Sequence, residues 1–257
     1  MSDNSKKIQV KISTFLYHEV TDNVTETGFQ TVGSLPYKHE INEFYNNLNA
    51  IMKANIPVTL VDSINLYLPD VFLMLTFDDG GKSAMFIADT IEKYNWRGHF
   101  FITTSMIDSK NFLSKREIKE LHQRGHIIGS HSHTHPDIFY NLSYKDMLKE
   151  WEISRDILSE IIDDRVYCAS IPGGEMNFNS QVSAHEAGFK FLFTSEPTLK
   201  PWRSGGVVNF GRVYPKKGSS LSKVLCLARH KCYFREIVKR KFKNFIKKFY
   251  YLFKSNG

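Results

Sequence analysis

Apolar segments of strand length alternate with amphipathic segments along most of this sequence. The apolar segments span residues 12–17, 58–61, 71–77, 99–103, 126–130, 166–171, 189–194 and 207–213. The amphipathic segments between them include 38–54, 82–95 and 143–162. Alternation of this kind is typical of parallel strands connected by crossover helices. We therefore predict an α/β fold, a distorted (β/α)7-8 barrel in a single domain, for which 257 residues suffice.

Positive charge is concentrated near the C-terminus. The formal net charge is +7, but residues 229–254 hold ten Lys or Arg and one acid, which leaves −2 for the rest of the chain. We expect no nucleic-acid partner, because no recognition motif accompanies this charge. The apolar residues of the segment follow helical spacing and are Phe234, Ile237, Val238, Phe242, Phe245, Ile246, Phe249 and Phe253. We divide the chain into a barrel, residues 1–228, and a basic amphipathic tail helix, residues 229–257.

Two interpretations of this tail stay open. As an interfacial helix, it would lie on an anionic membrane with its apolar stripe in the lipid. As the last helix of the barrel, it would pack the stripe on the domain and leave its basic face in water. The first interpretation adds an anionic membrane surface and a lipid-linked saccharide to the expected partners.

The cysteines and the N-terminus bear on the cellular compartment. Cys168, Cys226 and Cys232 are an odd number without a CxxC pair, which argues against a disulfide framework and favours a reducing compartment. We expect no signal peptide and no membrane-spanning helix, because no apolar run has the required length and setting. We therefore predict a cytoplasmic protein, peripheral to the inner membrane face if the tail binds lipid.

Polar residues directly follow four of the predicted strands. These segments read His18-Glu19, Asp78-Asp79-Gly80-Gly81, His131-Ser132-His133-Thr134-His135 and Pro172-Gly173-Gly174. Taken alone, an Asp-Gly or a histidine-rich segment is an ordinary polar turn. Because the carboxyl ends of the strands in such a barrel meet on one face, we expect the four segments to form one site.

The spacing of two histidines and the pair of aspartates indicate metal chemistry. His131 and His135 are four residues apart, which places them on one face of a helical turn. Two histidines and one carboxylate form a metal site with positions open for water. The set favours Zn²⁺, with Co²⁺, Ni²⁺ or Fe²⁺ as alternatives. Asp78 and Asp79 end a buried strand and point in different directions, so one can bind metal while the other acts as a base.

These motifs resemble those of a known family. Residues 76–80 read TFDDG, and residues 131–135 read HSHTH. Both are similar to the first two motifs of the polysaccharide deacetylases, the NodB-homology domain of carbohydrate esterase family four. The resemblance runs from about residue 15 to residue 193 and includes LYHEV, GHFFIT and REIKELHQRGHIIGSHSHTHP. In motif layout the chain is most similar to the poly-N-acetylglucosamine deacetylases.

The resemblance implies a role for each matching residue. The general base would be Asp78. The metal would be held by Asp79, His131 and His135. The wall of the substrate groove would be formed by the turn Pro172, Gly173 and Gly174, where a backbone N–H would help to bind the oxyanion.

The chain departs from the family's pattern in two places. Ser170 stands where the family often has an arginine that tethers the catalytic aspartate, and Arg212 is a candidate replacement. The late Leu-x-His motif that usually supplies the general acid has no clear copy, and His230 matches it poorly. In the poly-N-acetylglucosamine branch an early Tyr-His motif supplies this acid, which implies the role for His18. The alternative for His18 is a capping role at the end of its strand.

These features together predict a metal-dependent N-deacetylase that hydrolyses the acetamide of N-acetylated amino sugars in a glycan and releases acetate. The reaction would be a single displacement without a covalent enzyme intermediate. One alternative is hydrolysis of another C–N amide bond, which relatives on this fold perform. Another is a catalytically silent glycan- or membrane-binding module, which the serine at position 170 and the missing late histidine motif favour.

Overall fold

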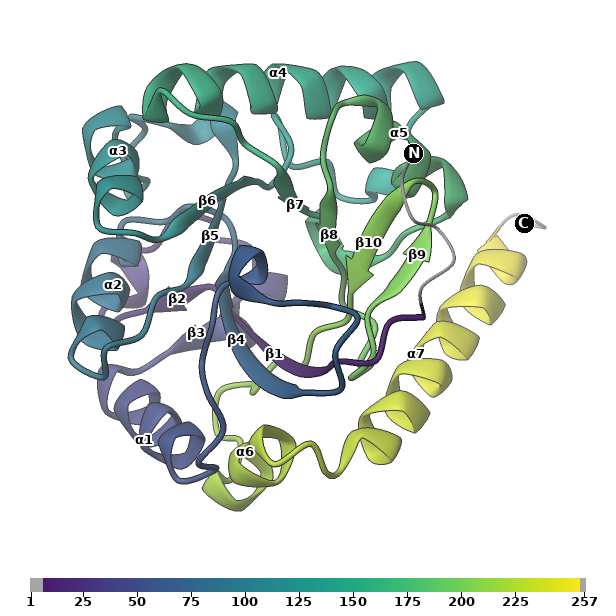
Figure 1. Ribbon diagram of the computed structural model, residues 1–257. Coiled ribbons are helices and arrows are strands. Elements are labelled where there is room, and N and C mark those ends of the chain that lie inside the picture. Colours follow the sequence, from purple (N-terminus) through teal and green to yellow (C-terminus); the bar gives the residue numbers. More distant parts are fainter. Residues whose placement is uncertain (1–6, 255–257) are drawn as a thin grey trace.

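Eight strands form one curled sheet at the centre of the molecule (Figure 1). The computed structural model describes residues 7–254, and for residues 243, 244 and 246–254 it describes the backbone alone. Along the sheet the strands are β1 (Lys11–Tyr17), β4 (Val71–Phe77), β5 (His99–Ile102), β6 (Ile127–Ser130), β7 (Cys168–Ser170), β8 (Phe191–Phe193), β10 (Val207–Phe210) and β9 (Trp202–Ser204). Every neighbouring pair is parallel except β9 with β10. The predicted α/β fold with a distorted barrel is confirmed.

A short contact closes the barrel beside β1. Val213, which follows β10, forms a parallel bridge with Phe15. The backbone N–H of Leu16 donates to the carbonyl of Val213 at 2.8 Å, and the N–H of Val213 donates to the carbonyl of Thr14 at 2.9 Å. The segment after β10 is thus joined to β1 by a bridge rather than by a full strand pair, which makes the barrel irregular.

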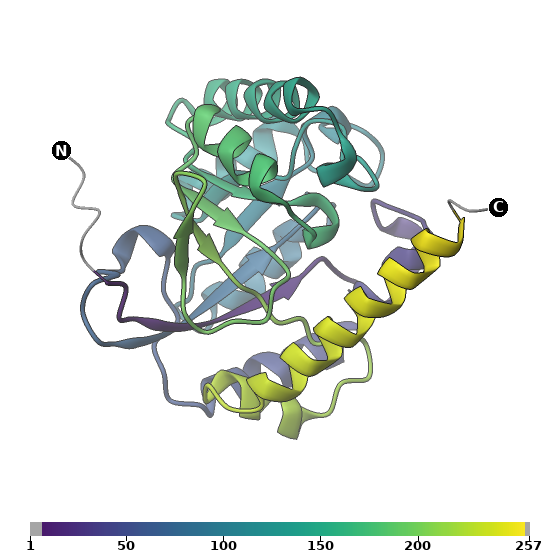
Figure 2. The same cartoon turned by 90° about the vertical axis from the view of Figure 1, so that its right-hand side faces the viewer.

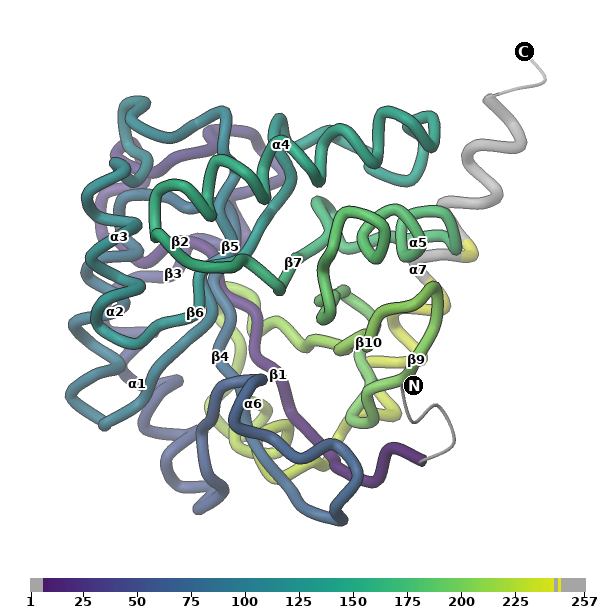
Figure 3. The backbone as a smooth tube through the Cα atoms, turned by 45° about the horizontal axis from the view of Figure 1, so that its top comes forward, coloured from purple at the N-terminus to yellow at the C-terminus, as the bar shows by residue number. Residues whose placement is uncertain are grey.

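Helices cover the outer face of the sheet (Figure 3). They are α1 (Ile41–Met52), α2 (Ala84–Glu92), α3 (Lys115–Gln123), α4 (Tyr144–Ile162), α5 (Phe178–Glu186), α6 (Leu221–Ala228) and α7 (Tyr233–Lys254). Leu73 and Leu75 of β4 pack in the cluster that the helices share, whereas Met74 between them packs inside the barrel with Phe101 and Phe193. Both faces of β4 are therefore buried, which explains its continuous apolar sequence.

The segment 58–61 does not form the predicted strand. Val58 makes only an isolated bridge with Leu73, and the chain then enters a 3₁₀ turn, Val61–Ser63. The sequence pattern also did not reveal a separate two-stranded sheet, formed by β2 (Glu19–Val20) and β3 (Lys38–His39). Its first strand, β2, begins just beyond the end of β1 in the sequence.

One pair of cysteines contradicts the prediction. Cys226 in α6 and Cys232 just before α7 form a disulfide, with Cα atoms 6.0 Å apart. His230 and Cys232 adopt positive φ angles of 57° and 63°, and this turn brings the two cysteines together. Cys168 is free and buried, as expected. Because disulfides are typical of oxidising compartments, the cysteines do not support a reducing one.

Helix α7 runs diagonally past the barrel from the end of α6 (Figure 2). Its buried residues include Tyr233, whose hydroxyl lies 2.6 Å from the hydroxyl of Ser13 on β1. Arg240, two helical turns further on, is also buried and donates to Glu196 at 3.0 Å. These contacts anchor the first half of α7 on the barrel, and the division of the chain at residue 228 stays a prediction.

The opposite face of α7 carries an exposed apolar stripe. Its described members are Phe234, Val238, Phe242 and Phe245. Their exposed fractions are 77%, 48%, 64% and 59%, in that order. These four side chains are thus about half exposed or more, the predicted member Ile237 is partly buried, and the predicted members Ile246, Phe249 and Phe253 lie outside the described side chains. Within residues 7–254, no helix is both long enough and apolar enough to cross a bilayer.

Candidate metal and catalytic site

The three predicted ligands converge at the carboxyl ends of β4 and β6. The candidate donor atoms of Asp79, His131 and His135 all lie within 4.8 Å of one another. Oδ1 of Asp79 is 3.4 Å from Nε2 of His131 and 3.6 Å from Nε2 of His135. Asp79 and His131 are buried, whereas His135 is partly exposed, so the set opens to solvent on the side of His135.

The two histidines meet through an irregular loop and not through the predicted helical turn. Residues 131–135 are not helical, and Ser132 and His135 adopt positive φ angles of 64° and 55°. The Ser132 hydroxyl accepts the backbone N–H of His135 at 3.1 Å, which folds the loop back on itself. The two histidines therefore lie close together, but the predicted helical turn is wrong and a folded loop brings them there.

Glu150 of α4 holds this loop from the outside. Its carboxylate accepts the backbone N–H of His133 at 2.9 Å and that of Thr134 at 2.7 Å. It also accepts the hydroxyl of Thr134 at 2.7 Å. Three hydrogen bonds to a charged acceptor restrain the backbone between the two ligand histidines.

The orientation of His131 suits a metal ligand. Its Nδ1 lies 2.9 Å from the carbonyl oxygen of Ser170 on β7. Because a carbonyl oxygen only accepts, Nδ1 carries the proton in the neutral ring. Nε2 then presents its lone pair toward Asp79, the arrangement that metal-binding histidines generally adopt.

Asp79 also fits a cation. Its Oδ1 is buried and has no hydrogen-bond partner among the described residues. A buried carboxylate oxygen without a partner is costly, and a cation between it and two imidazole nitrogens removes that cost. Asp79 has a φ of 78°, a backbone conformation that is rare outside glycine and is often retained for function. One oxygen and two nitrogens match the ligands that Zn²⁺ and related ions prefer.

The neighbouring Asp78 is bound by Arg212, so the candidate replacement for the missing arginine makes the expected contact. Nη1 of Arg212 donates to Oδ1 of Asp78 at 2.7 Å, and Nη2 donates to Oδ2 at 2.9 Å. Nη2 also donates to the Ser170 hydroxyl at 2.8 Å, and this hydroxyl donates to Oδ2 of Asp78 at 3.0 Å. Ser170, at the position of the missing arginine, thus supplies a second contact to the carboxylate.

Nearby charges keep both aspartates ionised. Burial by itself would raise the pKa of Asp78, but Arg212 and His131 outweigh burial and lower it. Burial would likewise raise the pKa of Asp79, yet His18 and His131 bring it well below its usual range. For His131 burial acts to lower the pKa, and the two carboxylates outweigh it and raise the value.

His18 lies at the end of β1 within the field of these carboxylates. Its ring packs against Tyr37, with centroids 4.9 Å apart. Its Nδ1 is buried and has no hydrogen-bond partner in the described part of the chain. Burial lowers the pKa of His18, and the charges of Asp79 and Asp78 partly oppose this effect. A capping side chain would use a ring nitrogen for a hydrogen bond at this point, and Nδ1 makes none.

The turn Pro172–Gly174 follows β7 beside Ser170. Gly174 has a φ of 67°, and a Cβ at this position would lie 1.8 Å from the hydroxyl oxygen of Ser195. Only glycine fits here without displacing a neighbour. The N–H of Gly174 donates to the carbonyl of Ile171 at 2.9 Å, so this N–H is engaged within the turn rather than available to an oxyanion.

Two residues near the site had no signal in the sequence. Glu150 lies in the middle of α4, where a single acid on a partly buried face matches no motif. Tyr37 ends a 3₁₀ helix, Val32–Tyr37, and is placed beside His18 only by the fold. Neither residue type nor spacing identifies such contacts, because the partner is distant in the sequence.

Comparisons with known proteins agree with these motifs. Residues 68–192 match the family model described as polysaccharide deacetylase. Over 68 residues the chain is 38% identical to the peptidoglycan-N-acetylglucosamine deacetylase PgdA of Listeria monocytogenes. The aligned segment covers 26% of this chain and 14% of that protein. The matched segments span about half or less of the length of the curated relatives.

Solved structures share the fold over most of the chain. A polysaccharide deacetylase from Bacillus cereus is similar with a TM-score of 0.70 and 18% identity, covering 85% of this chain and 69% of that one. IcaB from Ammonifex degensii is similar with a TM-score of 0.68 and 18% identity, covering 87% of this chain and 98% of that one. At these identities the likeness shows the fold.

Proposed function

Because the chain belongs to the polysaccharide deacetylase family through residues 68–192, we propose that it removes acetyl groups from N-acetylated amino sugars in a glycan. The observation that supports this most is the ligand set of Asp79, His131 and His135 beside an ionised Asp78. A ligand set next to a separate carboxylate base is the arrangement that amide hydrolysis by a metal enzyme needs.

The metal is Zn²⁺ in this proposal, with Co²⁺ or Ni²⁺ as alternatives, and when bound it supplies a Lewis acid for the acetamide carbonyl. Asp78 takes a proton from the attacking water, and Arg212 keeps its carboxylate oriented for this step. His18 gives a proton to the departing amine nitrogen. The C–N bond breaks, a C–O bond forms, and acetate and a free amino sugar leave.

The surroundings of His18 bear on a donor role in two ways. Burial lowers its pKa, whereas the charges of Asp79 and Asp78 favour the protonated ring that a donor needs. The Pro172–Gly174 turn forms one wall of the groove in which the sugar lies. Its backbone is held in place by the Ser195 N–H, which donates to the carbonyl of Gly174 at 3.2 Å.

The experiment measures bound metal and released acetate on the same samples. The purified chain should bind about one Zn²⁺, and His131→Ala should lose it. His133→Ala is the matched control, because His133 belongs to the same motif but bonds to Thr104 at 2.9 Å and lies outside the ligand set. Asp78→Asn should keep the metal and lose acetate release from N-acetylglucosamine oligosaccharides and peptidoglycan. Metal binding that is equal in both histidine variants contradicts the proposal.

We further propose that the exposed apolar stripe of α7 contacts an anionic membrane. The stripe includes Phe234 and Phe242, and of the exposed cations nearby, Lys231 lies just before this helix and Arg235 lies in its first turn. Apolar side chains between cations are complementary to a bilayer with anionic headgroups. Phe242→Ser should weaken co-sedimentation with phosphatidylglycerol vesicles, whereas Phe178→Ser, which removes an exposed phenylalanine from α5, should not. Equal effects of both variants would contradict this contact.

A cytoplasmic location stays a prediction, and the Cys226–Cys232 pair provides its test. Thiols can be trapped in the intact producing cell before lysis and then compared with those of the denatured, reduced chain. Free thiols at both positions support a reducing compartment. A pair that is already bonded in the cell places the chain in an oxidising compartment instead.

A further inference from the structure

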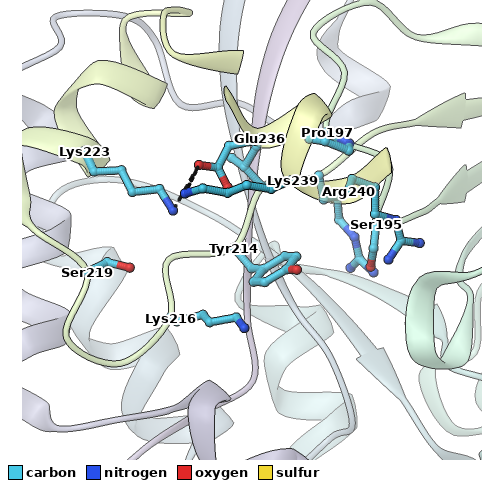
Figure 4. A pocket seen from close by; sticks show the side chains of 11 residues that line it. Ser195, Pro197, Tyr214, Lys216, Ser219, Lys223, Glu236, Lys239 and Arg240 are labelled. Carbon is cyan, nitrogen blue, oxygen red and sulfur yellow. Dashed lines mark hydrogen bonds and ion pairs between the residues drawn. The ribbon is translucent and has the colours of Figure 1, made fainter. Parts of the chain in front are cut away.

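A cationic cavity lies between α7 and the segment that follows β10 (Figure 4). We name it the α7 cavity, and its volume is about 270 Å³. Its cationic lining residues are Arg212, Lys216, Lys223, Lys239 and Arg240. Glu236 is the only acid among the described residues that line it, and the hydroxyls of Ser195, Ser219 and Tyr214 also face it.

The cations of this cavity are not fully neutralised by the acids around it. Lys223 and Lys239 share the single carboxylate of Glu236, at 3.2 Å and 3.4 Å, and Figure 4 shows their ammonium groups side by side. Lys216 places its ammonium nitrogen 5.8 Å from the centre of the Tyr214 ring. Of the buried cations, Arg240 has its own carboxylate partner in Glu196. The two lysines beside the single acid leave one positive charge in excess, Lys216 adds another, and such an excess attracts an anion.

The α7 cavity adjoins the catalytic residues. Arg212 lines the cavity and holds Asp78 with the same guanidinium. The Tyr214 ring lies 5.5 Å from that of Tyr37, which in turn lies 4.9 Å from that of His18. One layer of side chains therefore separates the cavity from the proposed base and acid. A ligand with an acetamide at one end and an anionic group at the other matches the chemistry of these two neighbouring places.

We propose that the α7 cavity binds a phosphate group of the substrate, so that the preferred substrate is an N-acetylated saccharide that carries a phosphate or diphosphate ester. This inference rests on the proposed deacetylase function. Lysine ammonium groups act as point charges with several donors each, which suits phosphate oxygens. A phosphate group with two negative charges balances two ammonium groups, whereas a carboxylate carries only one charge.

Glu236 allows a test in which anion affinity should rise, whereas a nonspecific effect of mutating the surface would not raise it. Its carboxylate now occupies the position between Lys223 and Lys239 and would repel an incoming anion. Glu236→Gln should therefore tighten anion binding, by about threefold or more. Lys216→Gln and Lys239→Gln should each weaken it by about tenfold, and the affinity should fall as salt increases. The matched control is Lys241→Gln, because this exposed lysine is on the same helix but does not line the cavity.

The first arm of the test measures binding of inorganic pyrophosphate to the full chain by calorimetry. Pyrophosphate probes the cavity without any reaction, so its result does not depend on catalysis. Binding that follows the order expected for the Glu236, Lys216 and Lys239 variants supports the proposal. Absent binding, or a loss in the Lys241 control equal to that in the Lys239 variant, overturns it.

The second arm compares acetate release from an N-acetylglucosamine oligosaccharide with and without a reducing-end phosphate. The proposal predicts a kcat/KM about tenfold higher for the phosphorylated form, and a ratio near one in the double variant of Lys216 and Lys239. Lysine-dependent pyrophosphate binding without any acetate release would refute the deacetylase function and leave the anion site standing. Displacement of pyrophosphate by phosphatidylglycerol vesicles but not by the phosphorylated saccharide would assign the cavity to lipid headgroups and overturn the substrate inference.

Discussion

Replacing Arg212 by methionine should leave the carboxylate of Asp78 buried without its guanidinium partner, with the His131 ring, 3.8 Å away, still near it. The two side chains are 1% and 3% exposed, so water screens the pair very little. Removing one partner of such a pair costs about 3–5 kcal/mol of unfolding free energy, because the remaining charge is uncompensated. Arg212 also donates to the carbonyl of Thr194 at 3.0 Å and to the hydroxyl of Ser170 at 2.8 Å. We therefore expect a loss in the upper half of this range.

A double-mutant cycle separates the charge pair from these other bonds. Asp78→Asn alone leaves Arg212 buried and unpaired, whereas the double variant removes both charges. The double variant should be more stable than the sum of the single losses predicts, by about 3 kcal/mol. Urea unfolding of all four proteins in chelator measures the cycle without a contribution from bound metal. Arg203→Met, at an exposed arginine on β9, is the control and should cost less than about 1 kcal/mol. Single losses that add to within about 0.5 kcal/mol would refute the reasoning.

Three further outcomes are expected. Burial lowers the pKa of both His99 and His126 to about 4. The unfolded chain binds these protons near pH 6.5, so the stabilisation is complete above that pH and declines as the pH falls toward 4. The expected loss of unfolding free energy is up to about 3 kcal/mol per histidine. The pH dependence of urea unfolding should accordingly flatten in a variant with glutamine at both positions, and an unchanged slope would be inconsistent with neutral buried imidazoles. Gly174→Ala should cost about 2–3 kcal/mol by thermal unfolding, because the new Cβ collides with a neighbouring side chain, whereas Gly218→Ala, which has a similar φ of 79° and open space around it, should cost about 1 kcal/mol. Glu150→Ala should weaken Zn²⁺ binding about tenfold in a competition titration by releasing the loop between the ligands, and an unaltered affinity would show that the loop holds its shape without it.

The strands and the ligand set could be predicted because local patterns encode them. A strand buried on both faces, such as β4, must be a continuous apolar run, and no other local structure of that length explains the run as well. The topology then brings the strand ends together, whatever the shape of the loops. Asp79, His131 and His135 therefore meet although the loop at 131–135 is not the helical turn that their spacing suggested.

The remaining features could not be predicted, because they depend on partners far apart in the sequence or on a choice between faces that the sequence pattern does not distinguish. Arg212 and Asp78 are 134 residues apart, and nothing near either residue marks the other as its partner. In α7 both faces carry apolar residues, Tyr233 on one and Phe234 on the other, so periodicity alone does not tell which face packs on the barrel. The Cys226–Cys232 pair depends on the turn between two helices, which residue spacing does not specify.

The bridge between Phe15 and Val213 also sets the order in which the site can be completed during synthesis. The three ligand residues are translated by position 135, and the strands that carry them lie in the first half of the chain. Arg212 is the residue immediately before the bridge, so it reaches Asp78 only when the last segment of the barrel joins the first strand. Closing so long a loop is a late event in folding, because its entropic cost precedes its contacts. The pair of Arg212 and Asp78 is thus the last part of the candidate site to be completed, and it forms with the final closure of the ring.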